Sequence, residues 1–163
     1  TVNVGLVGGG VRTNVVPDEA WAEFDVRFVT AADGLTLDRA VHQIASQTHI
    51  AGTHIEITGG IEKNPMEKTP ASAYLVDLIQ GVGKQLEISF QDAQTGGTSD
   101  GNYVSEMGIP TLDGLGPIGG LDHSPNEYLE RDSIVQRTTL LAGLLIEIAT
   151  HRDQILRYKS QPN

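Results

Sequence analysis

The stretch TGGTSDGNYVSEMGIPTLDGLGPIGGLDH, from Thr95 to His123, is the part of the chain that decides how the rest is interpreted. Its adjacent glycines Gly96 and Gly97 allow backbone conformations and close approaches that other residues do not. The polar residues 98–100 that follow are typical of a helix N-terminus, so we expect a short helix from about Asp100 to Met107. Main-chain N–H groups at the start of such a helix favour the binding of an anion. The stretch therefore predicts a binding site built on a loop.

The end of this stretch carries a candidate metal ligand. A second glycine-rich loop, residues 114–120, leads to His123, and Ser124 and Pro125 follow at once. An imidazole on a rigid turn is a common zinc ligand, although the residues alone leave a structural histidine open. Glu127 could orient the ring or be a solvated surface carboxylate. The other histidines are predicted to lie on helix or strand surfaces without a role: His42, His49, His54 and His151.

Three segments in this region resemble the C-terminal signature of a known enzyme family. GGTSDGNY, GIPTLDGLGP and DHSPNEYLE look, in this order, like the two-zinc exopeptidases that include glutamate carboxypeptidases, aminoacylases, acetylornithine deacetylases and succinyl-diaminopimelate desuccinylases. Upstream, GGGVRTNVVPDEAWAEFDVRF resembles the lid or dimerisation domain of that family, so the likeness covers about residues 1–150. The family's His-x-Asp, bridging Asp and Glu-Glu residues have no counterpart here. The resemblance implies the C-terminal part of a longer enzyme, inactive by itself.

The resemblance also implies roles for individual residues. His123 matches the C-terminal zinc ligand of the family, which binds two zinc ions per complete subunit. Gly96, Gly97 and Thr98 match the loop whose backbone contacts the carboxylate or acyl group of the substrate. Many relatives have a third glycine where this chain has Thr98. With Thr98 in place of this glycine, the loop can still bind an anion, but the width of the binding site does not follow from the sequence.

Two residues of the first part of the chain match substrate-binding positions of the family. Asn14 and Arg27 are expected to reach the active site, usually that of the partner subunit, where Asn14 would help stabilise an oxyanion and Arg27 would bind a carboxylate. On sequence alone, an Asx-turn asparagine and an exposed strand arginine are the alternatives. The expected protein is a homodimeric zinc amidohydrolase acting on a small carboxylate-bearing substrate. A glutamate carboxypeptidase-like activity is expected first; an N-acyl-amino-acid deacylase, a desuccinylase or a non-catalytic dimerising module are the alternatives.

Composition excludes several other classes of function. The 163 residues carry a formal charge of −10, which argues against nucleic acid because phosphate contacts need clustered Lys and Arg. No apolar run reaches the ~18 residues of a membrane span, so no membrane partner is expected. The absence of Cys leaves His, Asp and Glu as metal ligands. A cytoplasmic location is favoured, with a secreted or periplasmic one left open.

The hydrophobic pattern predicts an α/β fold in two parts. The first, residues 1–60, is expected to be an incomplete ferredoxin-like lid with an antiparallel sheet, and 61–70 a linker. Residues 71–152 are expected to form the C-terminal portion of a zinc-exopeptidase α/β domain with a parallel or mixed sheet, and 153–163 a polar tail. The predicted elements are strands at 2–8, 20–28, 54–58 and 88–90, extended chain at 109–112 and 128–129, and helices at 35–51, 70–86 and from Asp132 to about 150.

In the second strand, the alternating residues from Ala20 to Phe28 that include Phe24 are expected to form a buried face. Thr36 or Asp33 is expected to cap the first helix and Asp132 the last. The expected buried stripe of the last helix is Ile134, Leu141, Leu144, Leu145 and Ile148.

Overall fold

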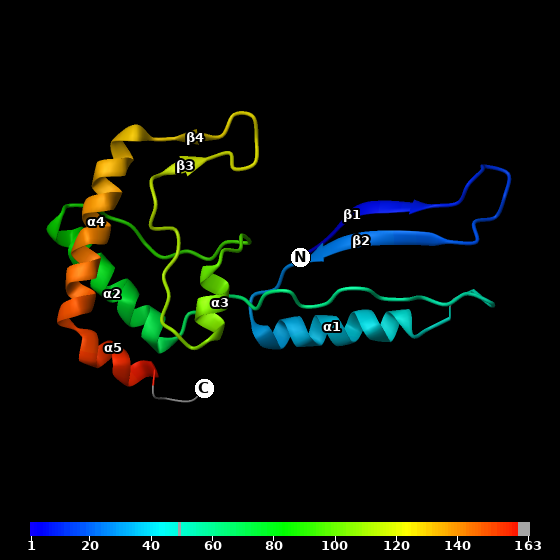
Figure 1. Ribbon diagram of the computed structural model, residues 1–163, viewed down its shortest axis with the longest axis horizontal. Helices are drawn as coiled ribbons and strands as arrows, with labels where there is room; N and C mark the ends of the chain where they lie inside the picture. Colours follow the sequence, from blue (N-terminus) through cyan, green and yellow to red (C-terminus); the bar gives the residue numbers. More distant parts are fainter. Residues whose placement is uncertain (49, 160–163) are drawn as a thin grey trace. The chain divides into compact units, whose positions relative to one another are not determined.

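The computed structural model describes residues 1–48 and 50–159, which form two compact units (Figure 1). The first unit is Thr1–Pro65, and the second begins at Met66. The boundary falls within the stretch 61–70. His49, one of the histidines assigned no role, lies outside the described residues.

The first unit begins with an antiparallel hairpin, as the alternating pattern predicted. Strand β1 (Val2–Gly9) pairs with β2 (Ala20–Val26), with an irregularity in register between Val4 and Leu6. Gly9 has φ 147°, and a Cβ atom there would lie 2.6 Å from the carbonyl oxygen of Glu19, so the turn requires glycine. The expected buried face of the second strand is wrong: the side chain of Phe24 is 46% exposed.

Helix α1 (Ala31–Ala45) begins four residues earlier than predicted and ends six residues before the expected end. The start differs because the helix is capped by Thr30, whose Oγ1 accepts the N–H of Asp33 at 3.1 Å. The predicted caps, Thr36 and Asp33, lie inside the helix. The end differs because Ser46 donates its hydroxyl to the carbonyl of Gln43 at 2.8 Å, a local bond that competes with helix continuation.

The rest of the first unit contains neither the predicted strand at 54–58 nor a hydrophobic core. Residues 54–58 are irregular, since a strand needs a neighbour and none of the described strands pairs with this segment. Among residues 1–48 and 50–65, no apolar side chain is fully buried. The closest packing of α1 is on the connection before it, where Gly34 lies directly against the ring of Phe28.

The second unit is built on two packed helices. Helix α2 (Pro70–Gln85) starts as predicted, with Thr69 and Ser72 forming a reciprocal capping box and Pro70 in the first turn. It packs against α4 (Arg131–Thr150), and Figure 1 shows the two helices together. The centre of this packing is the core of the protein, made by Ile79, Val82, Leu140 and Leu144.

Helix α4 differs from its predicted form at its start and on its buried face. Asp132 does not cap it; the helix begins at Arg131 after Glu130, without a side-chain cap. The hydroxyl of Ser133 instead donates to the carbonyl of Glu130 at 2.6 Å and accepts the N–H of Ile118 at 2.9 Å, which ties the helix start to the preceding loop. Of the predicted buried stripe, Leu144 is buried and Ile148 partly so, whereas three members are exposed: Ile134, Leu141 and Leu145.

By length and composition alone, α4 also qualifies as a helix that could cross a membrane. Its inner face, however, supplies Leu140 and Leu144 to the core with α2. The side of α4 that faces α2 is thus part of the core, while 17% of the apolar window is buried.

The chain after α4 is a further helix, α5 (Arg152–Lys159), where the sequence predicted a polar tail. The helix is held against α2 by Tyr74, whose hydroxyl donates to Gln154 Oε1 at 3.0 Å and whose ring lies 5.7 Å from that of Tyr158. The polar composition of the segment concealed these contacts.

Short elements complete the second unit. Helix α3 (Gly101–Glu106) and strand β4 (Tyr128–Leu129) lie where the sequence predicted a helix and extended chain, and β4 pairs antiparallel with β3 (Gly119–Gly120). The predicted strand at 88–90 is absent, because the N–H of Ile88 bonds back to Gly83 at the end of α2. No parallel or mixed sheet occurs in the described part of the chain. Helices with small antiparallel sheets confirm a mixed α/β fold.

Candidate active-site loops

The loop before α3 is closed by its own hydrogen bonds. The N–H of Ser99 donates to Asn102 Oδ1 at 3.0 Å, and the N–H of Gly101 donates to Ser99 Oγ at 3.0 Å. Asn102 is buried, whereas Asp100 at the N-cap position makes no side-chain cap bond. The N–H groups of Asn102 and Tyr103 in the first turn bond to the carbonyls of Ser99 and Asp100. The N–H of Gly97 donates to Thr95 Oγ1 at 3.3 Å. The first-turn N–H groups expected to face an anion are thus occupied within the loop, while Gly96, Gly97 and Thr98 remain exposed.

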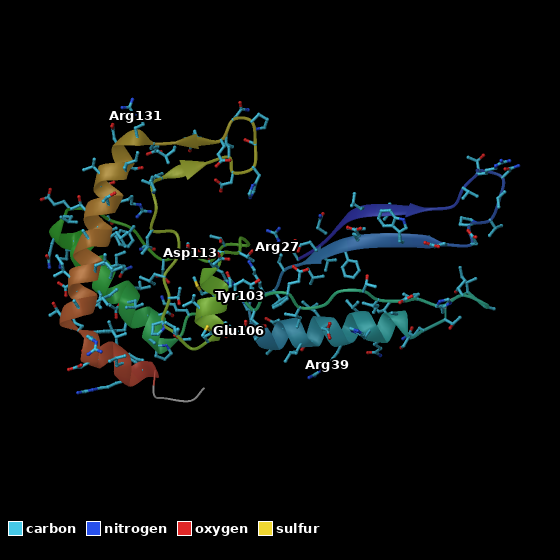
Figure 2. All side chains as sticks on the ribbon, in the orientation of Figure 1. Arg27, Arg39, Tyr103, Glu106, Asp113 and Arg131 are labelled. Atoms are coloured by element: carbon cyan, nitrogen blue, oxygen red, sulfur yellow. The ribbon has the colours of Figure 1, made fainter. Side chains whose placement is uncertain are left out.

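Asp113 lies on the segment that follows α3 (Figure 2). Its carboxylate accepts the N–H of Gly114 at 2.7 Å. The hydroxyl of Ser99, as the larger cause, and the N–H of Gly114 lower the pKa of Asp113 below its ordinary value, because both favour the ionised form. The same segment approaches the start of α3, where a Cβ atom at Gly101 would lie 3.5 Å from Cγ2 of Thr111.

His123 lies in a tight turn between β3 and β4. Its φ is 64°, and that of Leu121 is 59°, so two residues other than glycine adopt the left-handed conformation within three positions. The turn is closed by the N–H of Ser124 on the carbonyl of Leu121 at 3.1 Å and by the N–H of His123 on Glu127 Oε2 at 3.3 Å. Glu127 thus contacts the main chain of His123. His123 is exposed.

The described residues do not form a complete metal site. No three His, Asp or Glu side chains among residues 1–48 and 50–159 gather so that they could hold a metal ion. A catalytic zinc takes about three protein ligands. The surroundings of His123 in this structure therefore do not by themselves make a zinc site.

The structure does not bring Asn14 and Arg27 together. Asn14 lies in the turn where the N–H of Val15 bonds to the carbonyl of Arg12, beyond the closed end of the hairpin. Arg27 lies at the open end, where its main chain exchanges two hydrogen bonds with Thr1. At about 3.3 Å per residue, strand β2 alone separates the two by roughly 20 Å. One small carboxylate cannot contact both side chains from one hairpin.

Arg27 is itself engaged on the surface of the hairpin. Its Nε donates to Asp25 Oδ2 at 2.7 Å, and both side chains are more than half exposed (Figure 2). Exposed ion pairs contribute little to stability. The ion pair therefore contributes little to holding the hairpin together.

Sequence reasoning missed two residues that interact with the first loop. Asn102 follows Ser99 by three positions, the spacing of a capping box, and that spacing was the available signal. Asp113 precedes Gly114 in a turn-forming pair, which by sequence indicates only a turn. The effect of Ser99 on the pKa of Asp113 joins residues 14 positions apart and depends on how the two segments pack.

Comparison with known proteins agrees with the motifs. The sequence profile of Peptidase family M20/M25/M40 matches residues 3–147, and the chain belongs to this family. The resemblance seen in the sequence is thereby confirmed.

Similar individual proteins are succinyl-diaminopimelate desuccinylases of bacteria. That of Bordetella pertussis is 30% identical over 129 residues, covering 79% of this chain and 33% of the relative. That of Polaromonas naphthalenivorans is 29% identical over 146 residues, covering 86% and 34%. That of Janthinobacterium sp. is 27% identical over 123 residues, covering 76% and 32%. The chain spans about a third of the length of these relatives.

Proposed function

We propose that this chain is the C-terminal part of a zinc-dependent amidohydrolase that removes an acyl group from an N-acyl amino acid. The family match and the names of the relatives support hydrolysis of this type over the glutamate carboxypeptidase-like reaction expected first. The structural observation that carries the proposal is the turn at His123. Two hydrogen bonds, from the N–H of Ser124 to the carbonyl of Leu121 and from the N–H of His123 to Glu127, hold this exposed imidazole on a closed turn, as a metal ligand requires.

The residues of this chain have distinct parts in the proposed reaction. The chemistry that zinc supplies when bound is polarisation of the amide carbonyl and activation of water. His123 would be one of its ligands, kept in place by the turn that Glu127 closes. The exposed backbone and hydroxyl of Gly96–Thr98 would border the acyl or carboxylate group. The general base and the other zinc ligands would belong to the remainder of the full-length protein.

Replacing His123 tests this proposal. In the full-length protein, His123→Ala should remove about one equivalent of zinc and nearly all hydrolysis of N-succinyl amino acids. The melting temperature of the metal-free protein should change by only a few degrees, because an exposed imidazole contributes little to the core. His54→Ala, which removes another exposed imidazole, is the matched control and should keep both zinc and activity. Full zinc content in the His123 variant would overturn the assignment.

Arg27 provides the substrate-recognition part of the proposal, in trans within a homodimer. Loss of a bidentate contact between arginine and carboxylate costs about 1.5–3 kcal/mol, so Arg27→Ala should lower kcat/KM about 10- to 100-fold without loss of zinc. A purified hybrid dimer of Arg27→Ala and His123→Ala subunits should recover about half of the activity, because one site carries both lesions and the other neither. A hybrid that stays inactive would place Arg27 in its own subunit's site or in none. Asn14, at the far end of the hairpin, would serve a separate contact.

A further inference from the structure

Helix α4 carries large apolar side chains on two opposite sides, and α2 covers one of these sides (Figure 1). On the covered side, Leu140 and Leu144 belong to the core. On the other side, five large apolar side chains are between 39% and 73% exposed. We call these five the outer face of α4: Ile134, Val135, Leu141, Leu145 and Ile146. In the described part of the chain, the outer face therefore remains in contact with water.

The spacing of these residues shows that the outer face is one continuous surface. Ile134, Leu141 and Leu145 follow one another at intervals of seven and four residues, so they lie in one row along the helix. Val135 and Ile146 lie in the neighbouring row. At about 100° per residue, the two rows span an arc of about 140°. An apolar stripe at least about 100° wide is typical of a helix face that packs against a core.

The charged side chains of α4 lie away from the outer face. Between Ser133 and Thr150 the helix has two of them, Arg137 and Glu147, and the helical spacing places both on the side of the core. Both residues are half-buried. Interfaces between separately folded proteins usually have a polar rim, whereas layers inside one subunit meet through apolar surface. The uncharged outer face is therefore typical of a contact inside a subunit.

The length of the relatives indicates which polypeptide could cover this face. The chain spans about a third of the length of its desuccinylase relatives, and the family profile extends to residue 147, within α4. In a subunit of that length, α4 would have about two further thirds of polypeptide available to pack against. A membrane suits the helix less well, because Arg137 and Glu147 would have to enter the apolar phase with it.

We infer that the outer face of α4 is a docking surface within the subunit, covered in the full-length protein by the part of the polypeptide outside these 163 residues. This inference rests on the proposed function for the existence of that part, and on the burial pattern of α4 for the location of the contact. Helix α4 is then a central layer, with α2 on one side and the remaining polypeptide on the other. A helix that is apolar on all sides is normally buried on all sides.

A thiol on the outer face tests its burial directly. The 163-residue sequence has no cysteine, so Val135→Cys places one thiol at the most exposed position of the outer face. The thiol should react quickly with a maleimide in the 163-residue chain. In the full-length protein it should react at least about tenfold more slowly, because the reaction then requires local opening. Mass spectrometry of the peptide that contains residue 135 follows the reaction, and the urea-unfolded full-length protein gives the unprotected rate.

Two neighbouring leucines provide a matched pair of variants. Leu144→Gln changes the covered side of α4 and should lower the melting temperature by about 5 °C or more in both the 163-residue chain and the full-length protein. Leu145→Gln makes the same change on the outer face. It should shift the melting temperature of the 163-residue chain by about 2 °C or less, and that of the full-length protein by as much as Leu144→Gln does. Leucine and glutamine have similar helix propensities, so the difference reports burial.

Several results would overturn the inference. One is a thiol that reacts equally fast in both proteins, and another is a Leu145→Gln effect as small in the full-length protein as in the 163-residue chain. Protection that is lost on dilution would identify a second copy of the protein as the occupant. Protection that appears only with phosphatidylcholine vesicles would identify a membrane.

Hydrolysis of an N-succinyl amino acid by the unmodified full-length protein is measured separately. Its absence would refute the proposed function, whereas slow labelling of the thiol at position 135 would still support the docking surface.

Discussion

Both units of this chain contain helices and strands, but among the described residues only the second unit has a core of buried apolar side chains. In the second unit, Leu140 is 1% and Ile79 2% exposed, and the helices α2 and α4 enclose them. In the first unit, β1 and β2 pair with each other, yet Val4 is 58% and Phe24 46% exposed. Hydrogen bonds between strands thus form in the first unit without removing its apolar surface from water. The difference shows that pairing of strands and burial of side chains are separate requirements.

This difference predicts unequal stability. A two-stranded hairpin is marginal in water, and an isolated helix of 15 residues such as α1 is marginal as well. Hydrophobic burial is the main favourable term in folding, and the first unit obtains little of it. We expect the second unit to set the stability of the chain and the first to depend on a further surface to cover its apolar side chains.

The largest effect should come from truncating the core of the second unit. Leu140→Ala should reduce the free energy of unfolding by about 2–5 kcal/mol, because it leaves a cavity between α2 and α4. Phe24→Ala in the hairpin removes a larger side chain but should cost less than about 1 kcal/mol in the same chain, since that ring is not enclosed. Urea unfolding followed by circular dichroism compares the two. Equal losses would remove the distinction between the units.

Alanine substitutions at two glycines of the second unit should change the free energy of unfolding by smaller amounts and in opposite directions. At Gly143 on α4, a Cβ atom would lie 2.5 Å from Cγ1 of Val82, so Gly143→Ala should destabilise the chain by about 1–3 kcal/mol. At Gly81 on α2, nothing lies within 4 Å, and Gly81→Ala should stabilise by about 0.5–1 kcal/mol through helix propensity. Both changes add one methyl group to a helix of the second unit. Stabilisation by both would mean that the contact between α2 and α4 is looser than described.

The smallest effect concerns pH. The pKa of Asp113 is lowered by Ser99 and Gly114, so its contribution to stability is present above the unfolded pKa, near 3.8, and is lost as the pH falls through the folded pKa. The urea midpoint of the chain should therefore fall less steeply below about pH 4 in Asp113→Asn than in the unmodified protein. Identical acid profiles would indicate that Ser99 does not favour the ionised carboxylate.

The sequence predicted correctly those helix ends that depend only on neighbouring residues. Thr69 and Pro70 marked the start of α2, and Gly108 follows the short helix that the sequence predicted. The ordered motifs around Gly97 and His123 were enough to predict the family, which the profile match confirms.

The predictions failed where a distant contact decides the outcome. Asp132 is a good capping residue, but Ser133 bonds to Ile118 and the helix begins without a side-chain cap. Leu141 and Leu145 fit an apolar stripe, but α2 packs against the side of α4 that carries Leu140. Likewise, the effect of Ser99 on the pKa of Asp113 depends on the packing of two segments. Periodicity indicates which residues can be buried and does not indicate where the neighbour lies.

Amide hydrogen exchange of the 163-residue chain, resolved by residue, tests the difference between the units most directly. The account predicts that amides in the middle of α2 and α4 exchange only through global unfolding and are the slowest in the chain. It predicts that the paired amides of β1 and β2 exchange much faster, through local opening, despite their hydrogen bonds. Protection of the hairpin equal to that of α2 and α4 would contradict the account, because it would show that the first unit is stable without a core of its own.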